Sequence, residues 1–162
     1  LEIVILKNLI LVLFIILIFN LRGQIILGDS GSYLLSLFTG LYLIQFATQN
    51  STVSPFFIIL LLWYPCFELL FSMIRRTILS LKPYKPDIYH LHQIFFKVLK
   101  IKDKNNIKHL ATSLLINIYN FCSILIGLKF YNHSQTLALI IIINIIVYCS
   151  FYKFLKNKLN KI

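Results

Sequence analysis

Hydrophobic positions fall into five long and nearly uninterrupted runs along the chain. The runs cover about residues 3–20, 33–49, 53–73, 110–129 and 134–152. At a rise of about 1.5 Å per residue, a helix over each run crosses most or all of a hydrocarbon core about 30 Å thick. A helix also satisfies its backbone hydrogen bonds internally, as lipid requires. The pattern therefore predicts an all-α, polytopic membrane protein with about five transmembrane helices.

A shorter pattern lies between the third and fourth runs. A stripe of apolar residues recurs there at helical spacing, and Lys97 and Lys100 lie off it; its members are Leu91, Ile94, Phe95, Val98 and Leu99. Such a stripe predicts a short amphipathic helix that lies at the membrane interface. It is compatible with a structural role and with a site for a lipid-borne substrate.

The segments between the runs differ sharply in charge. Segment 21–32, the loop at about 74–109 and the tail after 152 carry one, nine and four basic residues, fourteen of the sixteen Lys and Arg in the chain. The turns at 50–52 and 130–133 carry none. By the positive-inside rule, we expect the basic segments and the C-terminus to be cytoplasmic.

Composition excludes several classes of protein. With 59% hydrophobic residues and a mean hydropathy of +0.83, a soluble domain of this length could not bury its apolar surface. The net charge of +11 follows from the topology, so we expect anionic membrane lipids as partners and no nucleic acid.

Cys66, Cys122 and Cys149 stand singly and are predicted to be buried free thiols. The chain starts at Leu1 without a basic n-region, which argues against a signal peptide.

The first candidate site is the segment Gly28-Asp29-Ser30-Gly31-Ser32, at the start of the second run. Asp and Ser here can cap a helix by accepting bonds from its first N–H groups. Alternatively, the Asp29 carboxylate can hold Mg²⁺, which prefers oxygen ligands and is often shared with substrate phosphates. The positive end of the helix also favours an anion.

The second candidate site contains Asp87, His90 and His92. Two histidines are too few for a typical zinc site. Histidine can also donate to phosphate oxygens or transfer a proton near neutral pH. Exposed loop histidines without a role are the alternative.

A third group of polar residues ends the third run. Arg75 and Arg76 fit topological anchors or phosphate contacts. Glu68 lies inside the run, where an ionisable residue is a functional candidate; an ion pair with Arg75 is the alternative. Two runs separate the Asp29 and His90 segments, so we expect both on the same membrane face.

Three stretches, in this order, resemble the polyprenyl-phosphate N-acetylhexosamine-1-phosphate transferase superfamily (glycosyltransferase family 4). They are Phe19-Asn20 with Ile25 to Ser32, Pro65-Cys66-Phe67-Glu68 with Arg75-Arg76, and Pro86-Asp87 through His90-Leu91-His92. The chain departs from the family pattern at three positions. Gln93 stands where a further His is common, Ile88 where Arg is usual, and Glu68 in place of Asp.

The resemblance implies transfer of a sugar-1-phosphate from a UDP-sugar to undecaprenyl phosphate, with Mg²⁺ or Mn²⁺ and release of UMP. The reaction would start synthesis of a cell-envelope polysaccharide, such as that of lipopolysaccharide, at the cytoplasmic face of a bacterial inner membrane. Asp29, as metal ligand, His90 and His92 would be the catalytic residues. Substrate would be bound by Gly28, Ser30, Gly31, Ser32, Arg75, Arg76 and Asp87.

The family's aspartate-rich and Asn-x-x-Asp-Gly motifs do not occur in this sequence. We therefore expect residues 1–162 to be a single membrane domain, the C-terminal half of a longer transferase, inactive alone. A second copy, in a homodimer, is a further candidate partner. A non-catalytic membrane remnant or subunit, and a transporter with a basic cytoplasmic loop, remain alternatives.

Overall fold

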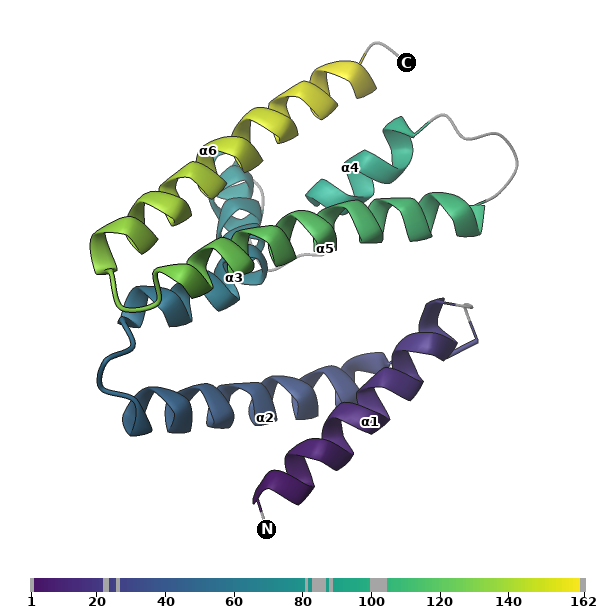
Figure 1. Ribbon diagram of the computed structural model, residues 1–162. Coiled ribbons are helices and arrows are strands. Elements are labelled where there is room, and N and C mark those ends of the chain that lie inside the picture. The colour runs from purple at the N-terminus through teal and green to yellow at the C-terminus, as the bar shows by residue number, and fades with distance from the viewer. Residues whose placement is uncertain are drawn as a thin grey trace. The chain divides into compact units, whose positions relative to one another are not determined.

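A computed structural model describes residues 2–21, 24–25, 27–80, 82, 87, 89–99 and 105–160, with the backbone alone at 2–6, 21 and 105–108. These residues form helices and no strand (Figure 1), which confirms the all-α prediction. The helices are α1 (Glu2–Leu21), α2 (Gly28–Gln49), α3 (Pro55–Ile78), α4 (Leu91–Val98), α5 (Asn105–Lys129) and α6 (Ser134–Leu159).

Internal contacts divide the chain into two compact units, Leu1–Phe46 and Ala47–Ile162. The first unit holds α1 and most of α2. The second holds α3 to α6. That residues 1–162 act as a single membrane domain stays a prediction.

In the first unit, α2 begins earlier than its apolar run suggests. Gly28 opens the helix with a φ of +68°, a conformation that glycine adopts without steric cost. The Ser32 hydroxyl donates to the Gly28 carbonyl at 2.8 Å, and Ser36 does the same to Ser32. The polar segment 28–32 is therefore the first turn of the helix and not a loop before it.

In the second unit, α3, α5 and α6 contact one another, and α4 packs against α5 and α6. The predicted stripe of α4 is buried at Leu91, Ile94 and Val98, which confirms an amphipathic helix. Its apolar face contacts protein, whereas we expected it to face the membrane interface. The neighbouring helices α5 and α6 cover the stripe and so remove it from both water and lipid.

One end of the second unit is closed by contacts between two turns. Ser54 caps α3, because its hydroxyl accepts the N–H of Phe56 at 3.2 Å. The same hydroxyl lies 2.8 Å from that of Ser134 at the start of α6. The Ser54 N–H donates to the Tyr131 carbonyl at 2.9 Å. The starts of α3 and α6 therefore lie together at this end.

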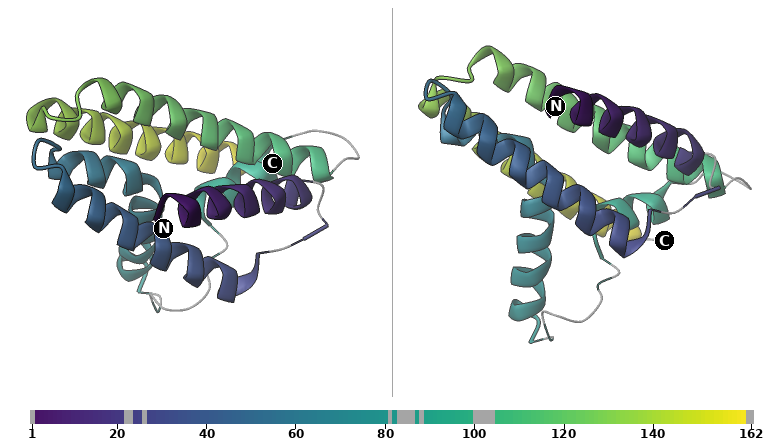
Figure 2. Two further views of the ribbon diagram at one scale, coloured as in Figure 1. Left: turned by 60° about the horizontal axis from the view of Figure 1, so that its bottom comes forward. Right: turned by 90° about the horizontal axis from the view of Figure 1, so that it is seen from below.

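Helix α3 bends in its middle, and its second half runs in a different direction from the first (Figure 2). Pro65 lies inside the helix, where it lacks an N–H donor and kinks the backbone. The helix ends beyond the predicted residue 73. The Leu79 N–H donates to the Arg75 carbonyl, and Ser80 adopts a φ of +56°, which stops the helix.

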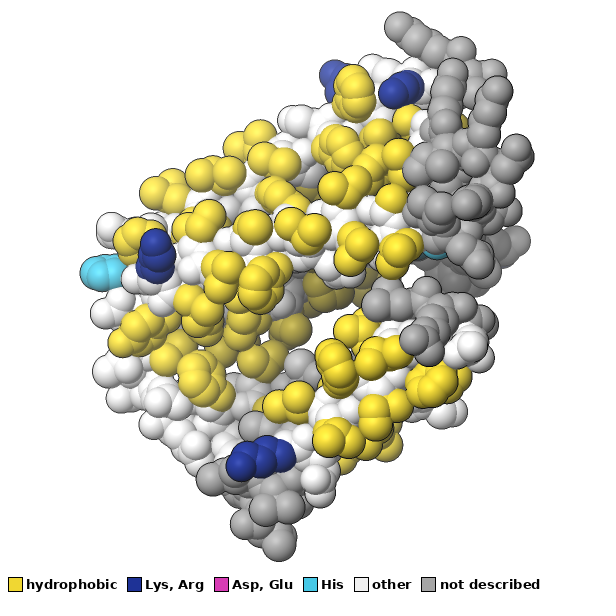
Figure 3. Space-filling view, turned by 45° about the vertical axis from the view of Figure 1, so that its right-hand side comes forward, with side chains coloured by type: hydrophobic (Ala, Val, Ile, Leu, Met, Phe, Trp, Pro, Cys, Tyr) yellow, Lys and Arg dark blue, Asp and Glu magenta, His cyan; other side chains and the backbone are white. Residues whose placement is uncertain are grey.

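Three helical segments are long and apolar enough to cross a membrane: Pro55–Ile78, His109–Lys129 and Ser134–Leu159. Only 17–22% of their apolar windows is buried, so most of these side chains need lipid around them. Apolar side chains cover the middle of the helices on the face in Figure 3, with Lys and Arg towards the helix ends. The chain is a membrane protein, whereas the predicted count of five spans is not confirmed. A shorter apolar helix covers Lys7–Asn20, and α2 is not among the candidate spans.

The cysteines are free, as predicted, but their predicted burial is wrong. Cys66 and Cys122 are exposed and Cys149 is partly buried. The helices turn Cys66 and Cys122 outward, where lipid surrounds an apolar side chain, whereas Cys149 packs in part against the core.

Candidate functional site

The C-terminal half of α3 carries a buried polar face. Glu68, Ser72, Arg75 and Arg76 recur at helical spacing and so share one side of the helix. Glu68 and Arg76 are each 8% exposed, and Ser72 is 6% exposed. Ionisable groups inside a spanning helix are costly unless they are paired. The partners of these side chains therefore define the site.

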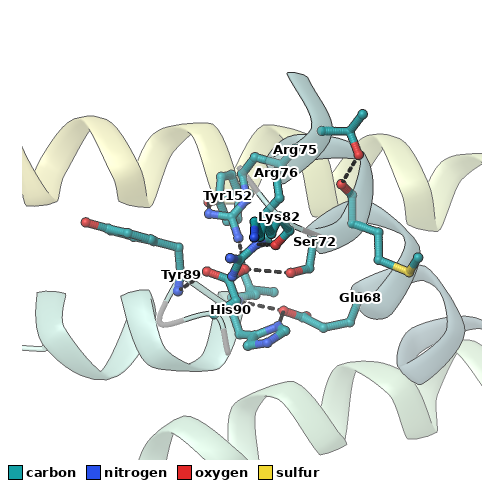
Figure 4. A network of polar contacts seen from close by, with 12 residues as sticks. Glu68, Ser72, Arg75, Arg76, Lys82, Tyr89, His90 and Tyr152 are labelled. Atoms are coloured by element: carbon teal, nitrogen blue, oxygen red, sulfur yellow. Dashed lines mark hydrogen bonds and ion pairs between the residues drawn. The ribbon is translucent and has the colours of Figure 1, made fainter. Parts of the chain in front are cut away.

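Asp87 is the partner of Arg75, whose surroundings Figure 4 shows. The side chains of Asp87 and Arg75 form an ion pair and are 8% and 13% exposed, respectively. The Ser72 hydroxyl donates to the Asp87 carboxylate at 2.5 Å, and the N–H of Tyr89 donates to it at 3.0 Å. Arg75 also donates to the hydroxyl of Tyr152 on α6 at 2.7 Å. Asp87 thus attaches the segment before α4 to both α3 and α6.

The pKa of Asp87 shows which influence prevails. Burial by itself raises the pKa of this carboxyl. The hydrogen bonds from Ser72 and Tyr89, with the nearby charge of Arg75, outweigh burial and hold the pKa below its usual value. Asp87 is therefore charged at neutral pH.

Glu68 binds the start of α4. One carboxylate oxygen, Oε1, accepts the N–H of Leu91 at 2.7 Å and lies 3.2 Å from Nδ1 of His90. The alternative of a Glu68–Arg75 pair is wrong, because the guanidinium of Arg75 is held by Asp87. Glu68 lies about two turns earlier on α3, where it faces His90.

The two histidines of the predicted site stack on each other. Their ring centroids lie 5.7 Å apart, with an angle of 9° between the planes. The pKa of His92 lies below its usual value. Burial is the main cause, Glu68 opposes it by raising the pKa, and the neighbouring His90 lowers the pKa further. His92 also lines a cavity of about 550 Å³ between α4 and α5. Among the described residues, no three His, Cys, Asp or Glu side chains form a metal site.

Arg76 donates from Nε to the Lys82 carbonyl at 2.9 Å. Its burial, and that of Arg75, shows that these side chains bind protein groups, whereas membrane anchors reach lipid head groups. The role of the two arginines as topological anchors stays a prediction. Their contact with substrate stays a prediction.

Sequence reasoning missed three residues of this network: Ser72, Tyr89 and Tyr152. Ser72 could have been found, because it lies one helical turn after Glu68. The Tyr89 ring lies 5.6 Å from the guanidinium of Arg75 and 5.5 Å from the ammonium of Lys97. Both are cation–π distances. Tyr152 is far away in the sequence, and nothing in its local pattern indicates the contact with Arg75.

In the first unit, Asp29 is exposed in the first turn of α2. It has no hydrogen bond or ion pair to any described residue, so its carboxylate is accessible. Ser30 is also exposed. The Ser32 hydroxyl donates to a carbonyl, whereas the capping interpretation needs it to accept an N–H. The space around Gly31 is tight, because a Cβ there would lie 2.8 Å from the Leu27 side chain.

The structure thus brings together Glu68, Arg75, Asp87 and His90 in the second unit. Asp29 belongs to the first unit, and its expected position on the same membrane face is a prediction that nothing yet tests. Other residues of the sequence argument lie outside the described residues, or have only their backbone described: Arg22, Ile26, Lys85, Pro86, Ile88, Lys100, Lys102, Asp103, Lys104, Lys108 and Lys161.

No model of a known protein family matches the chain, and no solved structure matches it. One curated protein is similar to it, the undecaprenyl-phosphate alpha-N-acetylglucosaminyl 1-phosphate transferase of Thermotoga maritima. The two are 30% identical over 111 residues, which is 67% of this chain and 34% of that protein. The chain therefore spans about a third of the length of this relative. The match supports a relationship to transferases of this kind.

Proposed function

We propose that the chain is part of an enzyme that transfers a sugar-1-phosphate from a UDP-sugar to undecaprenyl phosphate. The observation that carries the proposal is the attachment of the His90–His92 segment to the polar face of α3, through Glu68 and Asp87. The name of the similar Thermotoga protein supports the same acceptor lipid and the same kind of transfer. The product would start a cell-envelope polysaccharide.

The location of this network suits a reaction between a soluble donor and a lipid acceptor. Arg75 and Arg76 lie in the last turn of the spanning helix α3, so the network lies where the membrane meets water. Both substrates can reach such a boundary. The basic residues nearby support, through the positive-inside rule, our proposal that this boundary is the cytoplasmic face of the membrane. We propose a bacterial inner membrane because the similar protein is bacterial.

Each residue has a proposed role in phosphoryl transfer, which depends mainly on positioning and on stabilising charge. His90 and His92 contact the diphosphate of the donor. Asp29 acts at the phosphate with the N–H groups of the first turn of α2, which carry a partial positive charge. Ser30 and Ser32 add hydroxyl groups there, and Gly28, with nothing within 4 Å of its Cβ position, lets a phosphate approach the backbone. At Gly31 the Leu27 side chain fills that position, so its proposed role is its backbone N–H alone. Arg75, Arg76 and Asp87 hold the histidine segment, and we propose that they also contribute charge to the substrate site.

Asp29 fits a role as a magnesium ligand. Its carboxylate is exposed, and it makes no hydrogen bond or ion pair with the residues that the structure describes. Mg²⁺ is typically bound by one or two carboxylates, with water and substrate phosphates as its other ligands. Asp29 would supply one of these ligands, and the bound ion would neutralise charge on the phosphates. Mn²⁺ has the same preference for oxygen ligands.

Release of UMP tests the proposal. The assay uses membranes that contain the complete protein encoded by the gene. Undecaprenyl phosphate, Mg²⁺ and UDP-N-acetylglucosamine are added first, and other UDP-sugars are tested afterwards. We expect Asp29→Ala and His90→Gln each to lower the rate at least about 100-fold, as when a group that stabilises the transition state is lost. The control is Asn144→Leu, which removes a buried polar contact between α5 and α6 away from the network.

Full activity in Asp29→Ala would refute the role of that residue. If the unaltered protein released no UMP from any UDP-sugar, a non-catalytic membrane subunit would replace the transferase. Substrate flux into vesicles without UMP release would instead identify a transporter. Crosslinking of two copies in the membrane would show whether the chain forms a homodimer.

A further inference from the structure

The contact between Glu68 and the start of α4 has a chemical consequence for His90. The Glu68 side chain is 10% exposed and the His90 side chain 25%. The same oxygen of Glu68, Oε1, faces both the backbone N–H of Leu91 and Nδ1 of His90. The two residues come from different elements, α3 and the N-cap of α4. Figure 4 shows them side by side.

A backbone N–H can only donate, so Oε1 must be an acceptor in the bond to Leu91 at 2.7 Å. When Glu68 is a carboxylate, both of its oxygens can only accept. The proton between Glu68 and His90 then lies on Nδ1 of the imidazole. In the neutral ring, the other nitrogen, Nε2, then carries the free lone pair.

The direction of Nε2 follows from this contact. Nε2 lies on the far side of the ring from Nδ1, so the bond to Glu68 turns it away from α3. Among the described residues, the other ring contact of His90 is the stacked ring of His92. This stacking fixes the plane of the imidazole, while the carboxylate fixes its rotation. In metal sites, a carboxylate that accepts the N–H of one ring nitrogen of a histidine fixes the tautomer and the orientation of the ring in the same way.

We infer that Glu68 is a positioning residue, which holds the proton of His90 on Nδ1 and turns Nε2 towards the substrate phosphate. The part that concerns the phosphate rests on the proposed function. The part that concerns the proton does not. Glu68 acts through His90 and is not itself placed at the reacting atoms.

A purely structural role is the competing explanation, since Glu68 also binds the first N–H of α4. Two substitutions separate these roles. Glu68→Gln keeps an oxygen acceptor for both donors but removes the charge. Glu68→Leu removes the acceptor and the charge together. The titratable groups that face this pair are Asp87 and His92, together with the tyrosines Tyr64, Tyr148 and Tyr152 beside Glu68. All are unchanged in these variants.

Nitrogen NMR of the full chain, with ¹⁵N-labelled histidine in lipid nanodiscs, reports the tautomer directly. The chain has four histidines, and His90→Gln identifies the signals of His90. At a pH where His90 is neutral, we expect its proton on Nδ1 in the unaltered chain. We expect the same tautomer in Glu68→Gln. In Glu68→Leu we expect the proton on Nε2, the tautomer that free imidazole side chains favour in water. A proton on Nε2 in the unaltered chain, or no change in Glu68→Leu, would overturn the inference.

The kinetics of UMP release test the part of the inference that concerns the phosphate. They are measured on the complete protein that the gene encodes. We expect Glu68→Leu to lower kcat for UMP release by about 10- to 100-fold, as for other residues that orient a functional histidine. KM for the UDP-sugar should change less. Glu68→Asp should recover part of the rate, because it restores the charged acceptor. Asn144→Leu is the control for lost stability, with the melting temperatures of both variants measured.

A kcat in Glu68→Leu no lower than in Asn144→Leu, at an equal loss of melting temperature, would show a structural role only and overturn the inference. If NMR finds the proton on Nδ1 but the unaltered protein releases no UMP, the proposed function fails. The assignment of the proton then stands, and the orientation towards a phosphate falls with the function.

Discussion

Asp87 connects three parts of the second unit through a single carboxylate. Ser72 and Arg75 approach it from α3, and the N–H of Tyr89 approaches from its own segment. Arg75 extends the connection to Tyr152 on α6. A guanidinium that is 13% exposed needs its counter-ion, because an uncompensated charge at that depth is costly. Asp87 therefore stabilises both the fold and the position of His90.

Replacing Asp87 by Asn should lower the free energy of unfolding by about 2–3 kcal/mol at neutral pH, because a buried charge loses its partner. The folded pKa of Asp87 lies below its unfolded value. Its stabilisation is therefore complete above the unfolded pKa of about 3.9 and is lost as pH falls through the folded pKa. The melting curves of the two proteins should then converge in strong acid.

Fluorescence of Trp63 measures this effect, because it is the sole tryptophan of the chain and is 4% exposed. Melting is followed from pH 7 into strong acid, well below the unfolded pKa of about 3.9, in both proteins. A constant difference in melting temperature over this range would contradict the role given to the Asp87 charge.

Sequence reasoning identified most of the charged residues in this network but not how they pair. Glu68 and Arg75 lie two turns apart on one helix face, which made an ion pair between them plausible. The actual partners, His90 and Asp87, follow a loop whose course no local pattern specifies. Side-chain pairing between separate elements depends on tertiary packing, and periodicity along the chain does not report it.

At the level of helices, the apolar runs predicted every long element. The predictions differ from the structure at the ends of the helices. Helix α2 takes up the polar segment 28–32, and α3 continues through two arginines to Ile78. An apolar run marks the part of a helix that lipid surrounds, whereas the helix itself continues as long as its backbone bonds do. The ends depend on residues such as Gly28 and Ser80, with φ of +68° and +56°.

Helix α5 approaches α3 closely at Gly127. A Cβ at this position would lie 2.2 Å from Cδ2 of Leu60 and 3.6 Å from Leu137. Leu60 and Leu137 are fully buried, so neither can readily turn away. Small residues allow such close contacts between membrane helices. Gly127 therefore sets how tightly α5 packs on α3.

Gly127→Ala should lower the free energy of unfolding by about 1–3 kcal/mol, through overpacking. Gly40→Ala is the matched control, because nothing lies within 4 Å of a Cβ at that position in α2. Gly40→Ala should leave the free energy of unfolding unchanged or raise it by up to about 1 kcal/mol, because Ala has a better helix propensity than Gly. Denaturant titration in detergent, followed by Trp63 fluorescence, measures the Gly127 effect, and circular dichroism measures both. Shortening Leu60 to Val should restore part of the loss in Gly127→Ala, and no such coupling would contradict the contact.

For the whole molecule, the second unit has two chemically different ends. At one end, Ser54 and Ser134 join the starts of α3 and α6. The opposite ends of these helices carry Arg75 and Arg76 in α3 and Lys156 and Lys158 in α6. This separation of charge agrees with the sequence pattern. By the positive-inside rule, we expect the end with the histidine segment and the C-terminus of α6 to face the cytoplasm.

The first unit contributes Asp29, which the proposed reaction needs at the same boundary. Sequence topology predicts this, since an even number of expected spans separates Asp29 from His90. Both groups must approach one diphosphate for the proposed mechanism to operate. The central claim is therefore geometric, and it can be tested without substrate.

Pulsed electron–electron resonance between two spin labels tests this claim most directly. Labels are attached at Ser30→Cys in α2 and Lys97→Cys in α4, both exposed positions, in a variant that lacks Cys66, Cys122 and Cys149. The protein is measured in lipid bilayers, as its own gene expresses it. A shared phosphate site predicts a distance well below the hydrocarbon thickness of about 30 Å. A distance of about 30 Å or more, as for opposite membrane faces or distant places on one face, would contradict the transferase site.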